Sequence, residues 1–473
     1  MKIAVIGAGP AGITAAYQIS KQNHDVEVFE AGPSVGGLAK TIELWNQKVD
    51  LGPHRFFSND NRVNSIWLEV VGNDYEMVDR LTRIYYKRNF FHYPLKAVDA
   101  LTNLGLIEAA HCMLSYLGQK ISPTAQKGDF ESWVTSRFGK RLFEVFFKTY
   151  SEKLWGISCS ELDADFAAQR IKKLSLFEAI KNALIGSGAS KHKTLVDQFA
   201  YPHGGTGIVY ERMADFIMKK GGKVHLNTPV NRIITKEGKA CAIELETGQI
   251  MEFDHVVSSM PLTQMVMRLP EVPEAIKTAA AKLRFRNTIL VYLNVQAIDL
   301  FPDNWLYVHS SDLKMGRITN FRNWVPQLYK GEENTILTLE YWCYDEDDFW
   351  KLPESAMIEL AKQEIEKTGL IKNAQVSGGF VYRIPKCYPV YSTGYKEFLK
   401  PVEEYLTGIS GLSVIGRYGA FKYNNQDHSI LMGMLAAENI LKSTKHNLWD
   451  INTDYESYQE SSVITKTGLK LKA

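Results

Sequence analysis

The N-terminal pattern of apolar and polar positions predicts a strand, a helix and a second strand. Residues 2–6 form a short apolar run of the kind that a buried parallel strand requires, and residues 26–30 resemble a second strand. An alanine-rich stretch with the composition of a helix lies between them. Strands that alternate with helices are typical of a parallel sheet.

The middle of the chain has a helical period. From Tyr93 to about Lys193, apolar residues recur at spacings of three and four, for example within residues 130–134 and 142–147. This pattern predicts a helical insertion. Glycine, serine and lysine around residues 187–193 indicate a loop near its end.

Strand patterns dominate the second half of the chain. Residues 223–260 predict several strands with turns between them, and residues from about 270 to 399 alternate as strands, for example in residues 288–294. We expect the longer region to form an antiparallel sheet. Residues 411–417 then predict one more strand, and residues 425–441 predict a closing helix.

The composition is that of an ordinary globular protein. With 473 residues the chain exceeds what one hydrophobic core usually supports, so we expect two or three structural domains. The apolar share is 45% and the charged share 23%. Because the net charge is only +2, overall electrostatics favours neither nucleic acid nor an anionic membrane as a partner.

The cysteines indicate a reduced, cytoplasmic protein. The five are odd in number, far apart and without a Cys-x-x-Cys pair, which argues against a disulfide framework and against a metal site. The chain enters its first strand with no charged leader or apolar signal core, and no apolar run is long enough to span a membrane. A homo-oligomer and a peripheral association with membrane-bound partners are both open.

A glycine turn joins the first strand to the helix. Gly7 makes the tight turn, Gly9 lets the backbone approach a pyrophosphate, and Gly12 lets the helix pack on the strand. The helix N-terminus offers free N–H groups to the phosphates. Glu30 ends the next strand, where a carboxylate accepts hydrogen bonds from a ribose diol. The spacing therefore predicts a dinucleotide site whose ribose has no 2′-phosphate.

A second glycine pair decides which dinucleotide we expect. The stretch from Glu30 through Gly36 and Gly37 to Lys40 resembles the acid-plus-double-glycine signature of flavoproteins in the amine oxidase and protoporphyrinogen oxidase superfamily. The resemblance implies FAD rather than NAD as the cofactor. It also implies that Val230 lies near the adenine.

The patterns and this resemblance together predict an α/β fold. We expect a Rossmann-like FAD-binding domain, discontinuous in sequence, with a helical insertion and an antiparallel β-sheet substrate domain. The expected FAD-binding parts are residues 1–92, 201–265 and 406–445, the helical substrate-side domain is 93–200, the sheet domain is 266–405, and residues 446–473 are a docked or mobile tail.

Several later motifs occur in a fixed order. They begin with Asp50-Leu-Gly-Pro-His-Arg-Phe-Phe57 and end with Gly416-Arg417, Tyr423 and Asn425-Gln-Asp-His-Ser429. In this order they resemble UDP-galactopyranose mutase of the fungal and protozoan type, over nearly the whole chain to about residue 445. The other matching positions are Tyr93-Pro94, residues 130–133, residues 150–155, Arg170, residues 204–207, residues 305–307, Arg317 and residues 387–389.

The resemblance implies a ring contraction in which UDP-galactopyranose becomes the furanose, in surface polysaccharide synthesis and without net redox change. Reduced FAD would attack the anomeric carbon through N5 and displace UDP, forming a covalent flavin–sugar adduct. The sugar ring would then open and reclose through its 4-hydroxyl. No second glycine fingerprint is evident, so reduction would come from transiently bound NAD(P)H or from another donor.

A departing diphosphate needs fixed positive charge, and arginine offers planar forks to phosphate oxygens while it stays charged. Arg317 is the expected clamp on the leaving group, and His54 would tune the reduced flavin or follow its redox state. The resemblance implies catalytic residues His54, Arg170, Arg317 and Asn425, and substrate contacts from Tyr93, Trp305, Tyr307, Trp324, Tyr388 and Tyr423. The implied cofactor contacts are Gly7, Gly9, Gly12, Glu30, Gly36, Gly37, Lys40, Val230, Gly416, Arg417, Gln426 and Ser429.

The sequence departs from the family pattern at three places. Pro53 replaces a glycine of the flavin loop, and proline fixes φ and removes an N–H, which puts a redox-dependent loop movement in doubt. Leu95 and Lys96 replace an aromatic residue and an amide beside the base, and Trp324 replaces a phosphate-binding tyrosine. The sugar and the base are therefore left open.

Two other classes of function compete with the mutase. A redox flavoenzyme, such as an amine oxidase, a desaturase or a protoporphyrinogen-oxidase-like protein, would share the fold, because function resides in the site. It would need an apolar slot, whereas the mutase needs arginines and tyrosines that converge on one anion site. The second competing hypothesis is a non-catalytic flavin-binding scaffold, and the presence of His54 and Asn425 argues against it.

Overall fold

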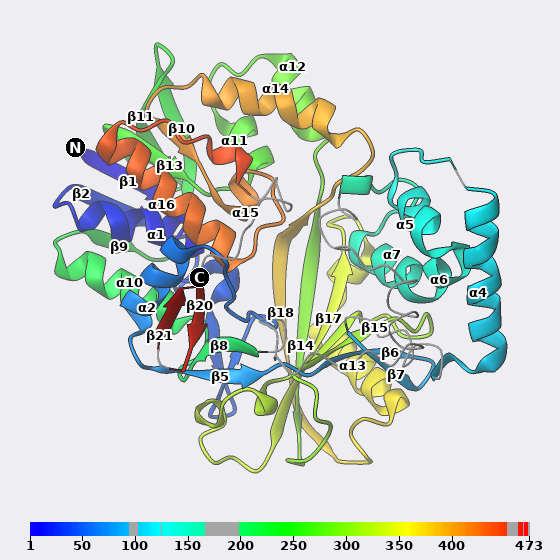
Figure 1. The fold of residues 1–473 in the computed structure, drawn as a ribbon. Coiled ribbons are helices and arrows are strands. Elements are labelled where there is room, and N and C mark those ends of the chain that lie inside the picture. Colours follow the sequence, from blue (N-terminus) through cyan, green and yellow to red (C-terminus); the bar gives the residue numbers. More distant parts are fainter. Residues whose placement is uncertain (94–102, 124, 166–197, 452–461, 467, 472–473) are drawn as a thin grey trace.

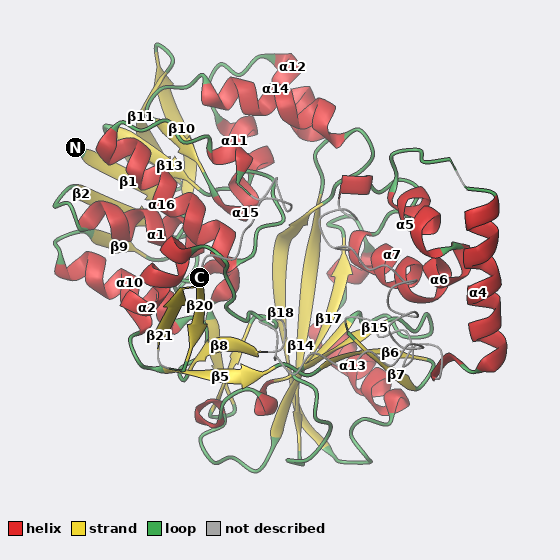
Figure 2. Cartoon of the chain, in the orientation of Figure 1, coloured by secondary structure: helices red, strands yellow, loops and turns green. Residues whose placement is uncertain are grey.

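The computed structural model describes residues 1–473 except 94–102, 124, 166–197, 452–461, 467 and 472–473. Figure 1 shows three regions, with a parallel sheet and its helices at the left, long antiparallel strands in the centre and a group of helices at the right. Figure 2 shows the same arrangement by secondary structure. The fold is thus the expected α/β architecture with a separate sheet domain and a helical insertion.

The parallel sheet is assembled from strands that lie far apart in the sequence. The first strand is central and pairs in parallel with a neighbour on each side, so that Val5 lies opposite Val28 and Val257. The order is β19 (Leu412–Val414), β13 (His255–Ser258), β1 (Lys2–Ile6), β2 (Asp25–Phe29) and β9 (Lys223–His225). This order confirms a Rossmann-like domain that is discontinuous in sequence.

Three helices pack together at this sheet, and the first of them contacts its strands directly. Helix α1 (Pro10–Ser20) packs against α10 (Ile208–Lys219) and against α16 (Gln426–Lys442). The contact with α16 is so close that a Cβ at Gly433 would lie 2.3 Å from the carbonyl oxygen of Ala11. The last long helix of the chain therefore packs on the first.

A seven-stranded sheet forms the second region. Its order is β18 (Val376–Pro389), β14 (Phe285–Val295), β17 (Thr335–Cys343), β16 (Arg317–Asn320), β15 (Trp305–Val308), β6 (Thr82–Tyr86) and β7 (Asn89–His92). All neighbours are antiparallel except β15 and β6, which are parallel. The last two strands come from the segment 1–92 that we expected in the cofactor domain. The alternation of apolar and polar residues predicts a strand but does not indicate which sheet that strand joins.

The described part of the insertion is helical, as its period predicts. It contains α4 (Leu106–Ile121), α5 (Phe130–Phe138), α6 (Lys140–Phe143), a π-helical turn (Glu144–Lys148) and α7 (Thr149–Trp155). The loop expected around residues 187–193 lies outside the described residues.

The remaining elements connect these regions. The helices are α2 (Asn61–Val71), α11 (Leu262–Arg268), α12 (Glu274–Ala281), α13 (Glu354–Thr368), α14 (Tyr395–Thr407) and α15 (Gly416–Gly419), with short 3₁₀ turns at Gly37–Ala39, Phe321–Asn323, Pro326–Leu328, Asp348–Lys351 and Leu448–Asp450. The strands are β3 (Thr41–Leu44), β4 (Gln47–Asp50), β5 (Tyr75–Asp79), β8 (Gln198–Pro202), β10 (Val230–Lys236), β11 (Lys239–Leu245), β12 (Ile250–Glu252), β20 (Ser462–Thr465) and β21 (Gly468–Leu471).

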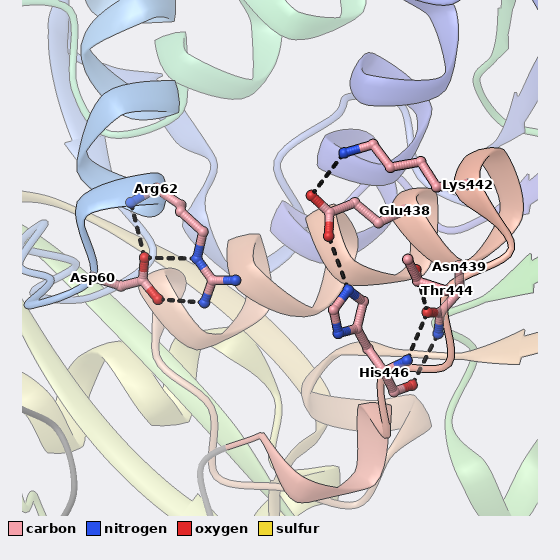
Figure 3. Close-up of polar contacts among 7 residues, drawn as sticks. All are labelled: Asp60, Arg62, Glu438, Asn439, Lys442, Thr444 and His446. Carbon is pink, nitrogen blue, oxygen red and sulfur yellow. Dashed lines mark hydrogen bonds and ion pairs between the residues drawn. The ribbon is translucent and has the colours of Figure 1, made fainter.

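Polar side chains secure two helix ends near the cofactor domain (Figure 3). Asp60 caps α2 by accepting the backbone N–H of Arg62 at 2.8 Å, and the guanidinium of Arg62 donates to the same carboxylate at 2.7 and 3.1 Å. Near the C-terminal end of α16, the Glu438 carboxylate contacts the His446 ring at 2.9 Å. A side chain that satisfies free N–H groups stabilises a helix start.

The C-terminal tail is docked where it is described. Strands β20 and β21 form a hairpin that contacts α2, and the Tyr75 hydroxyl donates to the Thr465 carbonyl at 2.6 Å. All five cysteines are free thiols. Among the described helices, none combines the length and hydropathy needed to cross a membrane.

Candidate active site

The turn between β1 and α1 is shaped by close packing. Gly7 has φ +92°, and its N–H donates to the Phe29 carbonyl at 2.8 Å. A Cβ at Gly12 would lie 2.0 Å from the Gly7 carbonyl oxygen, and a Cβ at Gly7 would lie 2.2 Å from the Ser259 hydroxyl. These two glycines are required by the protein itself.

Gly9 differs from its neighbours. A Cβ there would meet only the Gly37 Cα at 3.7 Å, which is an ordinary contact. Gly9 also occupies the N-cap of α1 and supplies no capping side chain, and Pro10 follows at the first helical position. The backbone at this turn lines a large cavity, so glycine here suits the close approach of a ligand phosphate.

Glu30 and the second glycine pair complete this end of the cavity. The Glu30 carboxylate accepts the N–H of Ala8 at 2.8 Å and the N–H of Gly32 at 2.9 Å, which fixes its orientation. Gly36 has φ +99° and donates its N–H to the Ala8 carbonyl at 2.8 Å. Each carboxylate oxygen keeps a further lone pair for a ribose hydroxyl. The residues present therefore fit a dinucleotide.

Lys40 lies beside this carboxylate. Its ammonium donates to the Ser34 hydroxyl at 3.2 Å, and burial lowers its pKa while the charge of Glu30 opposes that shift. A buried ammonium near a bound pyrophosphate is electrostatically favourable.

One cavity of about 940 Å³ collects most of the predicted site residues. This volume is at the upper end of the range for ligand sites and suits a cofactor with a substrate beside it. The predicted residues that line it are Gly7, Gly9, Glu30, Gly37, Lys40, His54, Val230, Trp305, Tyr307, Arg317, Tyr388, Gly416, Arg417, Tyr423, Asn425, Gln426 and Ser429.

The other predicted residues have different positions. Gly12 and Gly36 pack against the lining backbone, as described above. Tyr93 contacts the lining residue Tyr307, with ring centroids 5.0 Å apart. Trp324 is buried against Phe199, Tyr201, Trp305 and Phe321, and donates its indole N–H to the Asn304 carbonyl at 3.4 Å. Arg170 lies outside the described residues.

The loop that carries His54 is tightly held. The His54 ring contacts the Leu51 carbonyl at 2.9 Å, and its backbone carbonyl accepts from the Gln426 amide at 3.0 Å. Burial lowers the pKa of His54 to about 4, so the imidazole is neutral near pH 7. Gly52, two residues before His54, has φ +112°, which favours glycine. The loop thus presents a neutral imidazole to the cavity.

A buried polar network supports this loop from behind. Asp50 accepts the Thr41 hydroxyl at 2.6 Å and the Tyr201 hydroxyl at 2.7 Å, and burial raises its pKa to about 7. Gln426, at the start of α16, accepts the Tyr210 hydroxyl at 2.6 Å. The network ties the His54 loop to α16, which lies far away in the sequence.

Arg317 is part of a buried ion pair. Its Nε donates to Glu340 at 2.7 Å, and its Nη2 donates to the same carboxylate and, at 3.2 Å, to the Tyr388 hydroxyl. The two partners face each other across strands β16 and β17. Burial lowers the pKa of Arg317, but the Glu340 charge outweighs this effect and holds that pKa above its ordinary value. The positive charge is therefore already balanced by a carboxylate.

Arg417 is held by carbonyls and aromatic rings. Its guanidinium donates to the Cys387 carbonyl at 2.7 Å and to the Asn424 carbonyl at 3.0 Å. Its Cζ lies 4.6 Å from the ring centroid of Tyr388 and 4.3 Å from that of Tyr423. The two tyrosine rings stack 5.4 Å apart. Cations over aromatic faces are stabilised without losing their charge.

Sequence reasoning assigned no role to three residues that the structure places at or behind this site: Asp50, Arg55 and Glu340. Glu340 is the lone carboxylate in the otherwise uncharged strand β17, and such a residue in a buried strand signals a partner on the neighbouring strand. Asp50 and Arg55 were in a quoted motif, but the motif alone gave no partner for either.

The fold and the cavity define a flavoprotein. A model of the family described as flavin containing amine oxidoreductase matches residues 10–441, and the chain belongs to this family. A flavin is accordingly its cofactor. Among the described residues, no cluster of His, Cys, Asp and Glu could hold a metal ion.

Particular relatives include mutases and oxidases. A probable UDP-galactopyranose mutase of Klebsiella pneumoniae is 30% identical over 178 residues, which cover 34% of this chain and 43% of that enzyme. A coproporphyrinogen III oxidase of Staphylococcus aureus is 22% identical over 267 residues, which cover 50% of this chain and 55% of that enzyme. The chain thus matches less than two thirds of the length of either curated relative.

Solved structures cover nearly the whole chain. A reduced UDP-galactopyranose mutase superposes with a TM-score of 0.84 and 21% identity, over 96% of this chain and 99% of that one. A putative protoporphyrinogen oxidase from Exiguobacterium sp. 255-15 gives a TM-score of 0.72 and 16% identity, over 94% and 99%. At these identities the likeness establishes the fold. Membership of the fungal and protozoan type stays a prediction.

Proposed function

We propose that the protein is an FAD-dependent nucleotide-sugar mutase that converts a UDP-pyranose, in the first place UDP-galactopyranose, to the furanose. The reaction would serve surface polysaccharide synthesis in the cytoplasm. The observation that carries the proposal is the polar cluster at one wall of the cavity, in which Arg317, Arg417, Tyr388 and Tyr423 lie together. Such a cluster suits a diphosphate better than an apolar substrate.

The chain's own residues have distinct tasks in this reaction. When bound, a reduced flavin would supply nucleophilic chemistry at the anomeric carbon, with no net redox change. Gly9 and the α1 N-terminus would hold the cofactor pyrophosphate, and Glu30 would hold its ribose. We assign the neutral His54 to the flavin ring, and Asn425, the N-cap of α16, to the substrate side.

The leaving diphosphate must stay beside the sugar, because recombination is then effectively intramolecular. Arg417 contributes positive charge that no carboxylate pairs with among its described contacts, and the Tyr388 hydroxyl contributes a donor. Arg317 keeps one nitrogen, Nη1, outside its pair with Glu340 and can direct it at a phosphate oxygen. Charge stabilisation of this kind commonly contributes roughly 3–4 kcal/mol to catalysis.

A panel of nucleotide sugars tests the proposal. The dithionite-reduced holoprotein is incubated with each sugar, and furanose products are separated by chromatography. We expect product from at least one UDP-hexose, no product from the oxidised protein, and no stoichiometric use of the reductant. The boiled reduced protein is the control.

An FAD-dependent oxidase or desaturase is the second candidate. It is favoured by the neutralised Arg317 and by the aromatic residues that line the same cavity, Trp305, Tyr307, Tyr388 and Tyr423. Such an enzyme would consume one oxygen, or another electron acceptor, for each substrate oxidised. Oxygen uptake with an amine, porphyrinogen or polyene substrate, together with no furanose product, would replace the mutase proposal by this one.

A further inference from the structure

Arg55 differs from the other arginines of the cavity. Arg317 pairs with a carboxylate, and Arg417 donates to two carbonyls. Arg55 also lines the cavity, but its Nη1 is buried and has no hydrogen-bond partner, and its side chain forms no ion pair within the part of the chain that the structure describes. A buried charged donor without a partner is costly in a folded protein. Its presence requires a reason.

Among the described residues no carboxylate lies within ion-pair distance of Arg55, and the Asp427 carboxylate partly offsets its charge from farther away. Its Cζ lies 5.5 Å from the ring centroid of Phe57, which is a weak contact. Burial lowers the pKa of the Arg55 guanidinium and the neighbouring cation Arg80 lowers it further, while Tyr307, Tyr93 and Asp427 oppose these effects. Arg80 itself donates to the Tyr93 carbonyl at 3.1 Å and has a buried Nε without a partner. Arg55 at the cavity and Arg80 behind it therefore place two positive charges near each other, with Asp427 as the carboxylate that acts on Arg55.

The position of Arg55 relates it to the proposed substrate cluster. Tyr307 pairs with Arg317 across strands β15 and β16, and its hydroxyl also acts electrostatically on Arg55. Tyr307 therefore lies near both arginines, and all three line one cavity. Glu340 pairs with Arg317, whereas Arg55 has no carboxylate within ion-pair distance among the described residues.

We propose that Arg55 binds an anionic oxygen group of the substrate through its guanidinium fork. This inference rests on the proposed nucleotide-sugar function and adds a binding residue that the family resemblance did not assign. Two groups have the required chemistry, the diphosphate of the nucleotide and a carboxylate on the sugar, as in a uronic acid. Either would supply the missing acceptor for Nη1.

Binding measurements separate the two sources. Titration calorimetry on the holoprotein compares UDP, UDP-galactose, UDP-galacturonate and inorganic pyrophosphate, for the parent chain and for Arg55→Gln and Arg55→Lys. Arg62→Gln is the matched control, because this arginine lies seven positions later, outside the cavity lining, and is paired with Asp60 (Figure 3). Flavin content and the melting temperature are recorded for every variant.

If Arg55 holds the diphosphate, Arg55→Gln should lower the affinity for UDP, both UDP-sugars and pyrophosphate by about tenfold to a hundredfold, as expected for the loss of a hydrogen bond to a charged group. If Arg55 holds a sugar carboxylate, only the affinity for UDP-galacturonate should fall. Arg55→Lys should give an intermediate loss, since it keeps the charge and loses the fork. Arg62→Gln should bind like the parent.

The outcomes distinguish this inference from the proposed function. Parent-like binding of every ligand by a correctly folded Arg55→Gln protein would overturn the role of Arg55 and leave the mutase proposal standing. Arg55-dependent binding of pyrophosphate, with no binding of any nucleotide sugar, would support the anion site and overturn the mutase. If Arg55→Gln loses flavin, the Arg55→Lys protein provides the test. Binding of every ligand by Arg55→Lys with the affinity of the parent would overturn the role of the guanidinium fork. No binding of any ligand by the parent would overturn both.

Discussion

The Glu340 carboxylate accepts hydrogen bonds from two nitrogens of Arg317 across strands β16 and β17, and the side chains are 2% and 15% exposed respectively. The arginine that the sequence singles out for the leaving group is therefore neutralised in the absence of substrate. A buried pair is strongly destabilised when one partner is removed. This relationship governs how variants of either residue must be interpreted.

Glu340→Gln should reduce stability and strengthen anion binding. The change leaves the Arg317 guanidinium buried without its counter-charge, which typically costs about 3–5 kcal/mol. Urea denaturation should show the loss, and saturating UDP should recover part of it because the diphosphate supplies the missing charge. Glu43→Gln is the control, since that carboxylate is half exposed and pairs with Lys330 at the surface. Unchanged stability in Glu340→Gln would contradict the pairing.

Arg317→Lys and Arg317→Ala should lower turnover in that order, while the folded protein keeps its flavin. Lysine keeps the charge and loses the fork, and alanine loses both, so the alanine variant should lose on the order of a hundredfold in turnover. Because alanine also leaves Glu340 unpaired, the double variant Arg317→Ala, Glu340→Ala should be more stable than Arg317→Ala alone. Turnover like that of the parent in a folded Arg317→Ala protein would mean that the substrate carries no diphosphate at this wall.

Substitutions at Gly9 and at Gly12 should affect different properties, flavin binding in the first case and stability in the second. A side chain at Gly9 meets no crowded protein atom, so Gly9→Val should fold but bind little flavin, because its side chain occupies the space of the pyrophosphate. Gly12→Ala brings a Cβ to 2.0 Å from the Gly7 carbonyl oxygen and should lower the melting temperature itself. Flavin absorbance and the thermal unfolding of the flavin-free proteins separate the two effects. Full flavin retention in Gly9→Val would exclude the assigned cofactor position.

The His54 imidazole should make stability fall at acid pH. Its pKa is lowered from 6.5 to about 4, so between these values the unfolded chain binds a proton that the folded chain does not. Stability from this group is thus complete above pH 6.5 and falls by up to about 3 kcal/mol as the pH drops toward 4. Urea denaturation at pH 7.5, 5.5 and 4.5 measures this slope for the parent and for His54→Gln.

Asp50 acts in the opposite direction, because burial raises its pKa to about 7 and its contribution to stability falls as the pH rises from 4 to 7. Both proteins in the comparison keep Asp50, so its effect cancels in the difference between them. His54→Gln should have the smaller loss of stability on acidification. Equal losses in parent and variant would show that His54 is protonated as readily in the folded chain as in the unfolded one.

The sequence predicts the cofactor domain well because its signals are local. The strand at residues 2–6, the turn glycines and Glu30 form one continuous segment, and the structure assembles them as expected. The late motif around Arg417 and Asn425 reaches the same cavity. Patterns fixed by backbone geometry over short distances can be read without knowing the rest of the fold.

The sequence does not predict the partners across the large sheet. Whether Arg317 faces a phosphate or a carboxylate depends on its register with Glu340, which lies on another strand. The same limit applies to β6 and β7, whose alternation fits either sheet, and to Trp324, which we expected at the substrate but which packs among aromatic rings. Register and sheet membership are long-range properties that one sequence does not encode in a local pattern.

The dependence of α1 on α16 has a consequence for biogenesis. Nearly every residue of α1 is buried, and the cover is supplied by a helix that begins at Gln426, with β19 completing the sheet edge just before it. During synthesis the flavin turn therefore leaves the ribosome long before its own scaffold exists. Nascent chains should expose an apolar first helix, rely on chaperones to shield it, and acquire the cofactor only when translation is almost finished.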